Sequence, residues 1–228
     1  MPSNEIEKVT PAKVPIEING HGLQLTGLDE MYRWAKYVKA SGLAPDTLKT
    51  PEAIMVAMQA GLEAGMTPMA ALNSIAVVKG RPTWYSKAAK GRVLSSGFCK
   101  DWTQGVDSKG DDRHGWVKSK RQGLDGYKET QFSVADAKGL GLWGKNEWAR
   151  QPDNMLLCRA IGRHVVDWYG DVMNNMRTYE EVQDADWPDR SRDVEPPSKR
   201  DPLLVDAEIL EDDTKDDLFG DGPSPQEG

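Results

Sequence analysis

The sequence predicts an α+β fold: N-terminal helices, a β-hairpin followed by a helix and a small antiparallel sheet, and a long C-terminal helix. Three observations predict it. Helix start signals cluster before residue 73, alternating segments between residues 98 and 132 indicate short strands, and an apolar stripe of helical period begins at Pro152. The 228 residues suffice for one sizeable domain with an appendage. The expected parts are an N-terminal arm over residues 1–25, a core domain over 26–186 and a disordered acidic tail over 187–228.

The first helices are marked by their caps. Thr26 to Asp29 has the spacing of a capping box and predicts a helix that runs to about Ala40. Thr50-Pro51 and Thr67-Pro68 each place a capping residue before a proline at the first helical position. The small and apolar residues of these segments predict core packing. Before them, the arm carries at most a short strand near Val14–Ile18.

The next stretch, Ala64 to Lys100, contains no Asp or Glu in 37 residues. Strand propensity at Ser74–Val78 and Arg81–Tyr85, with Lys79-Gly80 between them, predicts a hairpin. Pro82 is typical of an edge strand, where its missing N–H is not needed. We expect Ser86 to cap a helix over Lys87–Ser95 that ends at Gly97.

This acid-free stretch is the candidate binding surface. Sustained local positive charge favours a polyanion, because neutralised phosphates release condensed counterions. Trp84 and Tyr85 are candidates for stacking on bases. The alternative is an ordinary solvated hairpin and helix face. The cations of the stretch are Lys79, Arg81, Lys87, Lys90, Arg92 and Lys100.

Three further segments predict a meander: Phe98–Thr103, Gly115–Arg121 and Tyr127–Phe132. Alternation in the middle segment places Trp116, Lys118 and Lys120 on one face. This face is either a platform for a nucleic-acid backbone and its bases or an exposed edge protected by lysines.

The longest predicted helix runs from Pro152 to about Tyr169, after a capping box at Ser133 to Asp136. Its buried stripe is Met155, Cys158, Gly162, Val165 and Tyr169. Arg159 and Arg163 lie on another face, with His164 alongside. Asp167 is placed to pair with Arg163, whereas Arg159 has no partner on the helix and is the better ligand candidate. Thr178 to Glu181 is a further capping box before a last short helix.

The net charge of −7 divides unevenly along the chain. Residues 187–228 hold 13 acidic and 5 basic residues, and the other 186 residues hold 23 acidic and 24 basic residues. The tail is rich in Pro, Asp and Ser, so it cannot bury enough apolar area to offset its chain entropy. Within it, Leu203–Leu210 is either a partner-binding segment or part of a solubilising tail.

No catalytic or metal-binding motif is recognisable. Three scattered histidines show no metal-ligand spacing, and Cys99 and Cys158 indicate neither a zinc site nor a disulfide framework. Gly139 to Asn146 fits G-x-x-x-x-G-K, but Asn146 stands where a P-loop needs Ser or Thr, and a helix precedes it. We read it as a loop presenting Lys145. We therefore expect a protein without a cofactor that is not an enzyme.

The sequence also lacks an apolar run long enough to span a bilayer, and its first residues do not form a signal peptide. We expect a protein of the reducing cytoplasm with no membrane partner.

Three stretches, in this order, resemble phage and prophage RecT-type recombinases of the RecT/Redβ superfamily. They are GMTPMAALNSIAVVKGRP at 65–82, FSVADAKGL at 132–140 and PDNMLLCRA at 152–160. The resemblance covers roughly residues 28–184. It implies an ATP-independent single-strand annealing protein of DNA recombination and repair, encoded by a phage or prophage and acting in the bacterial cytoplasm. Between Phe98 and Tyr127 the chain departs from the family pattern, which puts the roles of residues there in doubt.

The resemblance further implies a homo-oligomer, a ring or a helical filament, on single-stranded DNA and the annealed duplex intermediate. Its implied partners are a 5′-to-3′ exonuclease and a host single-strand-binding protein. By position, the hairpin and following helix line the DNA groove, and Arg159 matches the family's arginine. The alternatives are a magnesium-dependent nuclease or other DNA-processing enzyme, and a non-enzymatic DNA-binding scaffold. The predicted DNA-binding residues are Lys79, Arg81, Trp84, Tyr85, Lys87, Lys90, Arg92, Lys118, Lys120, Arg159 and Arg163.

Overall fold

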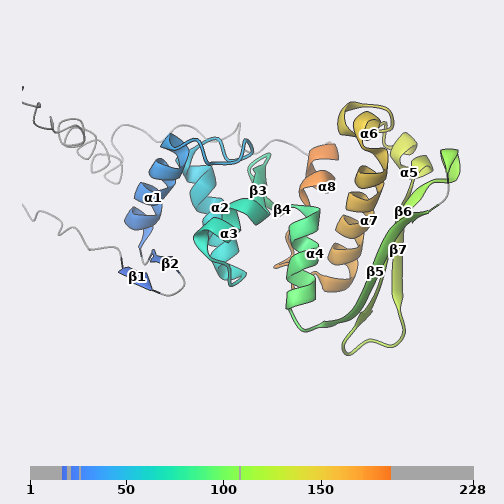
Figure 1. Ribbon diagram of the computed structural model, residues 1–228, viewed down its shortest axis with the longest axis horizontal. Helices are drawn as coiled ribbons and strands as arrows, with labels where there is room; N and C mark the ends of the chain where they lie inside the picture. Colours follow the sequence, from blue (N-terminus) through green and yellow to red (C-terminus); the bar gives the residue numbers. More distant parts are fainter. Residues whose placement is uncertain (1–16, 20–21, 26, 108, 186–228) are drawn as a thin grey trace, which may run out of the picture. The chain divides into compact units, whose positions relative to one another are not determined.

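The computed structural model describes residues 17–19, 22–25, 27–107 and 109–185 and has the predicted α+β class (Figure 1). The acidic tail and most of the N-terminal arm lie outside these residues. The arm contributes one short antiparallel pair, β1 (Glu17–Asn19) and β2 (Gly22–Gln24). The strand expected near Val14–Ile18 therefore falls only partly within the described residues.

Three helices follow: α1 (Leu28–Ala40), α2 (Pro51–Glu63) and α3 (Pro68–Ser74). The cap predicted for α2 is confirmed, because Thr50 accepts a hydrogen bond from the Ala53 N–H. The residue that caps α1 is Gly27, and Thr67 precedes α3 without a side-chain cap bond. Gly61 lets α2 and α3 approach closely, since an added Cβ would lie 2.2 Å from the Ala71 Cβ.

The predicted hairpin is confirmed as β3 (Ile75–Val78) paired with β4 (Arg81–Trp84). Lys79 and Gly80 both have positive φ, at 51° and 70°, which is the geometry of a two-residue turn matched to the twist of a hairpin. Helix α4 (Ser86–Ser95) begins one residue earlier than predicted. Tyr85 is its N-cap residue, so the cap predicted at Ser86 is wrong.

The meander is also confirmed. Strands β5 (Cys99–Asp107), β6 (His114–Arg121) and β7 (Lys128–Ser133) form an antiparallel sheet in that order. A short 3₁₀ turn, η1 (Gly110–Asp112), lies between β5 and β6. Because β6 is the central strand, the interpretation of its lysines as guards of an exposed edge is wrong.

Four helices complete the described chain: α5 (Val134–Gly139), α6 (Asn146–Arg150), α7 (Pro152–Tyr169) and α8 (Tyr179–Asp184). The capping box of α5 is present, with Ser133 and Asp136 exchanging hydrogen bonds. Gly139 ends α5 and Asn146 begins α6, so a helix and not a strand precedes the segment between them, as predicted. Thr178 precedes α8 without a side-chain cap bond, so that helix forms without its predicted capping box.

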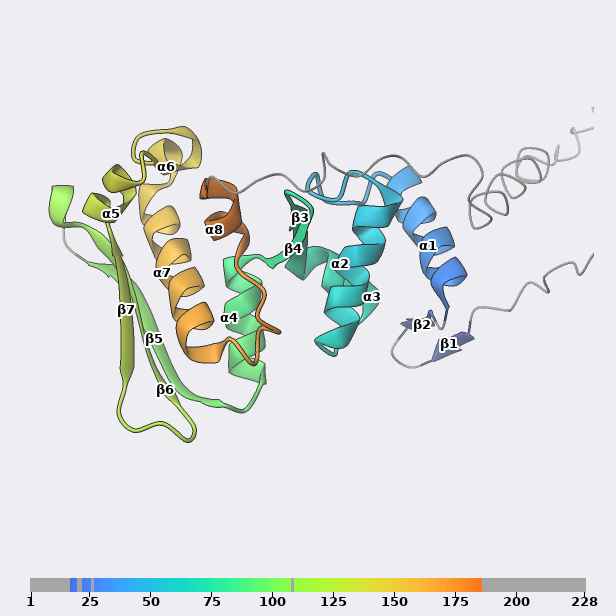
Figure 2. The same ribbon diagram turned by 180° about the vertical axis from the view of Figure 1, so that it is seen from behind.

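Helix α7 packs against β6 and β7 on one side and against α4 and α8 on others, as both ribbon views show (Figures 1 and 2). Two glycines permit these close approaches. A Cβ on Gly115 of β6 would lie 2.5 Å from the Leu156 carbonyl, and one on Gly162 of α7 would lie 2.4 Å from the Thr178 hydroxyl oxygen. Of the predicted stripe on α7, Cys158, Gly162, Val165 and Tyr169 are buried and Met155 is half-buried.

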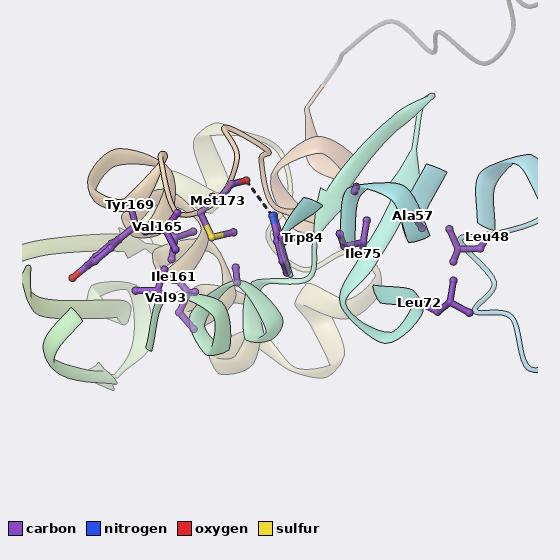
Figure 3. Close-up of a cluster of buried hydrophobic side chains, with 14 of the residues drawn as sticks. Leu48, Ala57, Leu72, Ile75, Trp84, Val93, Ile161, Val165, Tyr169 and Met173 are labelled. Atoms are coloured by element: carbon purple, nitrogen blue, oxygen red, sulfur yellow. Dashed lines mark hydrogen bonds between the residues drawn. The ribbon is translucent and has the colours of Figure 1, made fainter. Parts of the chain in front are cut away.

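Trp84 is the largest fully buried side chain among the described residues and has no exposed surface (Figure 3). Its indole Nε1 donates to the Met173 carbonyl at 3.2 Å, and its backbone N–H donates to the Arg177 carbonyl at 2.9 Å. The end of β4 is thereby joined to the segment between α7 and α8. Ile75, Ile161 and Val165 belong to the same buried cluster.

A buried polar network joins α7 to the sheet. His164 is hydrogen-bonded through Nε2 to the Ser119 hydroxyl at 2.8 Å and through Nδ1 to the Thr130 hydroxyl at 2.9 Å. The Ser119 hydroxyl also meets the Tyr169 hydroxyl at 2.9 Å. Burial lowers the pKa of His164 to about 4. The imidazole is therefore neutral in the core and not beside the α7 arginines, where the sequence placed it.

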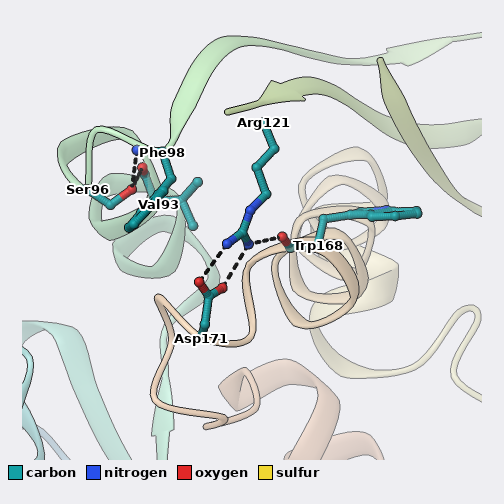
Figure 4. A network of polar contacts seen from close by, with 6 residues as sticks. All are labelled: Val93, Ser96, Phe98, Arg121, Trp168 and Asp171. Atoms are coloured by element: carbon teal, nitrogen blue, oxygen red, sulfur yellow. Dashed lines mark hydrogen bonds and ion pairs between the residues drawn. The ribbon is translucent and has the colours of Figure 1, made fainter. Parts of the chain in front are cut away.

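A second network fastens the end of β6 to the end of α7. Arg121 makes two hydrogen bonds to the Asp171 carboxylate, at 2.8 and 2.6 Å, and a further one to the Trp168 carbonyl (Figure 4). Its guanidinium lies 5.2 Å from the centroid of the Tyr169 ring. The hydrogen bond to Arg121 lowers the pKa of Asp171. Arg121 thus supplies a cation where the unpaired carbonyls of a helix end favour one.

His164 makes the stability of the fold sensitive to acid. Its folded-state pKa lies below its ordinary value, so the stability it contributes is present above about pH 6.5 and is lost as pH falls toward 4. The full difference corresponds to about 3 kcal/mol. We expect His164→Asn to lose less free energy of unfolding than the wild type between pH 7 and pH 4, measured by urea denaturation. Carboxylate titration is common to both proteins and cancels, so equal losses would contradict the assignment.

Candidate nucleic-acid interface

The main candidate site is a groove between α4, β5 and α7, which we call the α4 groove. It is a half-open cavity of about 350 Å³. Its lining combines two lysines from one face of α4 with apolar side chains and one amide, and includes no carboxylate. The lining residues are Lys87, Lys90, Gly91, Leu94, Gln104, Leu157, Cys158 and Ile161.

The two lysines carry the positive charge of the groove. Lys87 and Lys90 lie three residues apart, so they project from the same side of α4. Lys87 is exposed and Lys90 half-buried, and neither forms an ion pair with any residue that the structure describes. Arg92, on another side of α4, is half-buried. Uncompensated ammonium groups one turn apart can contact successive anionic groups of a ligand.

Cys158, at the same groove, is not a reactive thiol. Burial raises its pKa to about 12, and nearby Lys87 offsets this only in part. A thiol of this kind is protonated at neutral pH and is a poor nucleophile. The groove therefore has the character of a binding surface, with charge at its lysines and apolar groups beside them.

The start of α4 is held by a carboxylate from a distant part of the chain. The Ser86 hydroxyl donates to Glu180 Oε2 of α8 at 2.5 Å. Burial raises the pKa of Glu180, while hydrogen bonds from Ser86 act to lower it. Because the first turn of α4 has no acidic residue of its own, Glu180 supplies the negative group that a helix N-terminus favours.

Tyr85 is held by neighbours on both sides. Its hydroxyl meets the Thr47 hydroxyl at 2.9 Å, and its ring centroid lies 5.2 Å from that of Tyr179. Tyr85 is half-buried, and Trp84, the other predicted stacking residue, is fully buried. The prediction that Trp84 stacks on bases is therefore wrong, because the core and not solvent surrounds its indole.

The cations of the hairpin tip do not join the α4 groove. Lys79 Nζ donates to the Ala185 carbonyl at 2.6 Å, just beyond α8. Arg81 is half-buried opposite Val78 in the hairpin. The tip lysine is thus directed to α8, whereas Lys87 and Lys90 of α4 line the groove beside β5 and α7. That the hairpin and the helix together line a DNA groove stays a prediction.

A second, smaller cavity of about 120 Å³ carries three arginines, and we call it the arginine pocket. The guanidinium groups of Arg159 and Arg163 lie 5.1 and 5.0 Å from the centroid of the Phe132 ring. Arg177 pairs with Glu181. The lining residues are Phe132, Arg159, Arg163, Val166, Asp167, Arg177 and Glu181.

Arg159, for which the sequence offers no partner on α7, pairs with a residue of another helix. Its Nε lies 3.9 Å from Asp184 Oδ2 of α8, and only 11% of its side chain is exposed. Burial lowers its pKa, an effect that Asp184 opposes. Arg163 is exposed and donates to the Gln131 carbonyl at 3.1 Å, not to Asp167. The arginine pocket thus mixes both signs of charge.

The sheet face turned away from α7 carries the third group of predicted residues. As predicted, Trp116, Lys118 and Lys120 share this face, since the residues between them are buried. Lys118 Nζ lies 3.9 Å from Glu129 Oε2, and Lys120 is opposite Asp101. The indole of Trp116 lies across Gly105, where an added Cβ would be 3.0 Å from the ring. Acidic neighbours therefore reduce the attraction of this face for a polyanion.

Two functional residues were not found from the sequence. Gln104 lines the α4 groove, and Glu180 positions the helix that carries its lysines. Period-two alternation along β5 would have placed Gln104 on the same face as Trp102, toward α7. No local signal connects Glu180 to Ser86, because 94 residues separate them.

Comparison of the chain with protein-family models, with curated proteins and with solved structures finds no match. Within the described ranges, no three His, Cys, Asp or Glu side chains gather as a set that could hold a metal ion. No helix in that part of the chain is both long and apolar enough to cross a bilayer.

We expect two substitutions of Glu180 to have different effects on the free energy of unfolding. Since burial penalises its ionised form, Glu180→Gln should be at least as stable as the wild type at pH 7, because the amide oxygen still accepts from Ser86. Glu180→Ala should lose about 1–2 kcal/mol, because the Ser86 hydroxyl is left unpaired. The free energy of unfolding from urea titrations measures both.

The same experiment has a pH signature. The folded-state pKa of Glu180 is raised, so its contribution is largest at low pH and is lost as pH rises through that pKa. Relative to Glu180→Gln, the wild type should gain stability as pH falls from 7 toward 5. A large loss of stability in Glu180→Gln at pH 7 would show that α4 requires the negative charge itself.

Proposed function

We propose that the protein binds single-stranded DNA and anneals complementary strands without ATP, acting as an oligomer. The observation that carries the proposal is the α4 groove, where Lys87 and Lys90 stand one turn apart without a counter-ion among the described residues. The acid-free stretch from Ala64 to Lys100 and the resemblance to RecT-type recombinases support the same function.

In this mechanism the lysines of α4 contact the phosphate backbone of one strand. Neutralised phosphates release counterions, which supplies most of the sequence-independent affinity. Backbone contacts leave most base edges free to test a second strand. The free energy of annealing comes from base pairing, so no nucleotide is hydrolysed.

An oligomer is part of the proposal for a geometric reason. On α7, Leu157 and Ile161 of the α4 groove lie on the side opposite to Arg159 and Arg163 of the arginine pocket. A single chain therefore offers a short cationic site and not a long track. Neighbouring copies would align successive α4 grooves along one strand.

The function is tested by removing the α4 charges. Lys87→Ala/Lys90→Ala should weaken binding to a labelled oligothymidylate and flatten its salt dependence. The slope of log K against log salt should fall by about 1.4, because each single-strand phosphate contact contributes about 0.7. Fluorescence anisotropy at several salt concentrations measures both quantities.

The matched control is Lys39→Ala/Lys49→Ala, which removes the same charge from exposed positions of α1 and the segment after it. This control should keep the wild-type slope. Annealing of two complementary labelled oligonucleotides without ATP completes the test. Shortening of the strands in magnesium would indicate a nuclease, and binding without annealing would indicate a scaffold.

A further inference from the structure

We propose that the α4 groove is a nucleobase-binding site, which takes an unstacked base from the strand whose phosphates contact Lys87 and Lys90. The inference rests on the proposed function and adds to it a base-binding role for the apolar part of the groove. It concerns contact with a base and not sequence recognition, because one amide and several apolar side chains do not distinguish the four bases.

The composition of the groove fits an amphipathic ligand of this kind. Leu94, Leu157 and Ile161 provide apolar surface, and the lysines stand beside it. A nucleotide has the same arrangement: a flat base with apolar faces, joined through a sugar to an anionic phosphate. At about 350 Å³ the cavity is within the size range of small-molecule sites and larger than a single base needs.

Gln104 supplies the polar contact that orients such a ligand. Its Oε1 accepts a hydrogen bond from Trp102 Nε1 at 2.8 Å, which fixes the orientation of the amide group. The amide NH₂ remains as a donor at the groove. Each of the four bases offers ring nitrogen or carbonyl acceptors, so one donor suits any of them.

The groove also supplies apolar surface, which the buried Trp84 does not. Trp84 is fully buried, and the ring of Tyr85 packs near that of Tyr179. A strand held at Lys87 and Lys90 therefore meets Leu94, 46% of which is exposed, and the apolar side chains of α7. Burial of a base face against these groups removes apolar surface from water.

Gly91 keeps the groove open. A Cβ added there would meet nothing within 4 Å, although glycine is unfavourable inside a helix. The helix itself therefore does not require a glycine at this position. A larger side chain at residue 91 would enter the groove without disturbing the core.

Gly91→Leu is the test of the proposal. Binding is measured to a labelled oligothymidylate and to a strand of the same length and charge in which all bases are replaced by abasic sites. The wild type should prefer the strand with all its bases by about fivefold or more, the lower end of single-base contributions. Gly91→Leu should remove most of this preference and keep the salt slope. Leu94→Ala, at a half-exposed position, should reduce the preference in part.

Gly139→Leu is the matched control, because Gly139 is also a helical glycine with open space around it and lies in α5, outside the groove. It should keep the wild-type preference. If Gly91→Leu keeps that preference too, or if the wild type binds both strands equally, the nucleobase site is overturned while DNA binding stands. Failure of the wild type to bind either strand would instead overturn the proposed function.

A competing occupant is separated by the same variants. The alternative ligand is an acidic peptide that contains leucines. The proposal is overturned in favour of a protein partner if three results occur together: the peptide binds the wild type, Gly91→Leu abolishes that binding, and the wild type shows no preference for the strand with bases.

Discussion

The burial of Trp84 is the constraint on which the candidate site depends. Its indole and backbone N–H both donate to carbonyls of the segment between α7 and α8, which fastens the end of β4 to that segment. Helix α4 begins two residues later, at Ser86. The fully buried Trp84 thus helps to fix the position of Lys87 and Lys90 beside α7. Loss of this side chain would cost stability and would also displace the cations, which makes its two effects inseparable in a binding assay alone.

The second constraint is on the sequence of helix α7, because this helix packs against several elements at once. Its contacts with the sheet, α4 and α8 use different sides, and Gly115 and Gly162 allow two of these neighbours to approach the backbone closely. The polar network of His164 belongs to the sheet side, whereas Arg159 and Arg163 face α8 and β7. Residues that are adjacent along α7, such as Arg163 and His164, can therefore differ in role: the first lies at the surface and the second stabilises the core.

What the sequence predicted well was local. Proline after threonine, the Lys79-Gly80 turn and the capping box at Ser133 each act within a few residues, and the structure contains the corresponding elements. The local errors concerned caps, since Tyr85 and not Ser86 is the N-cap residue of α4 and Thr178 makes no cap bond. The other errors concerned distant contacts. An aromatic pair after a cationic turn indicates a stacking surface, but solvent exposure depends on α7 and α8, about ninety residues away. Arg159 looked unpaired because its partner, Asp184, lies on a different helix.

The charge around the acid-free stretch, Ala64 to Lys100, also depends on distant segments. A run without Asp or Glu guarantees low negative charge along the chain but not in space, because other segments bring their carboxylates to it. Burial raises the pKa of Asp184 and Lys79 acts to lower it. Lys79 also donates a hydrogen bond to the Ala185 carbonyl, and Glu180 lies at the start of α4. The cations of the stretch that remain uncompensated at a cavity are Lys87 and Lys90, at least among the described residues. Contacts with α8 and the residue after it therefore engage Lys79 and the start of α4, and they leave the α4 groove as the candidate cationic site. This groove is where we propose that the phosphates and one base of a DNA strand bind together.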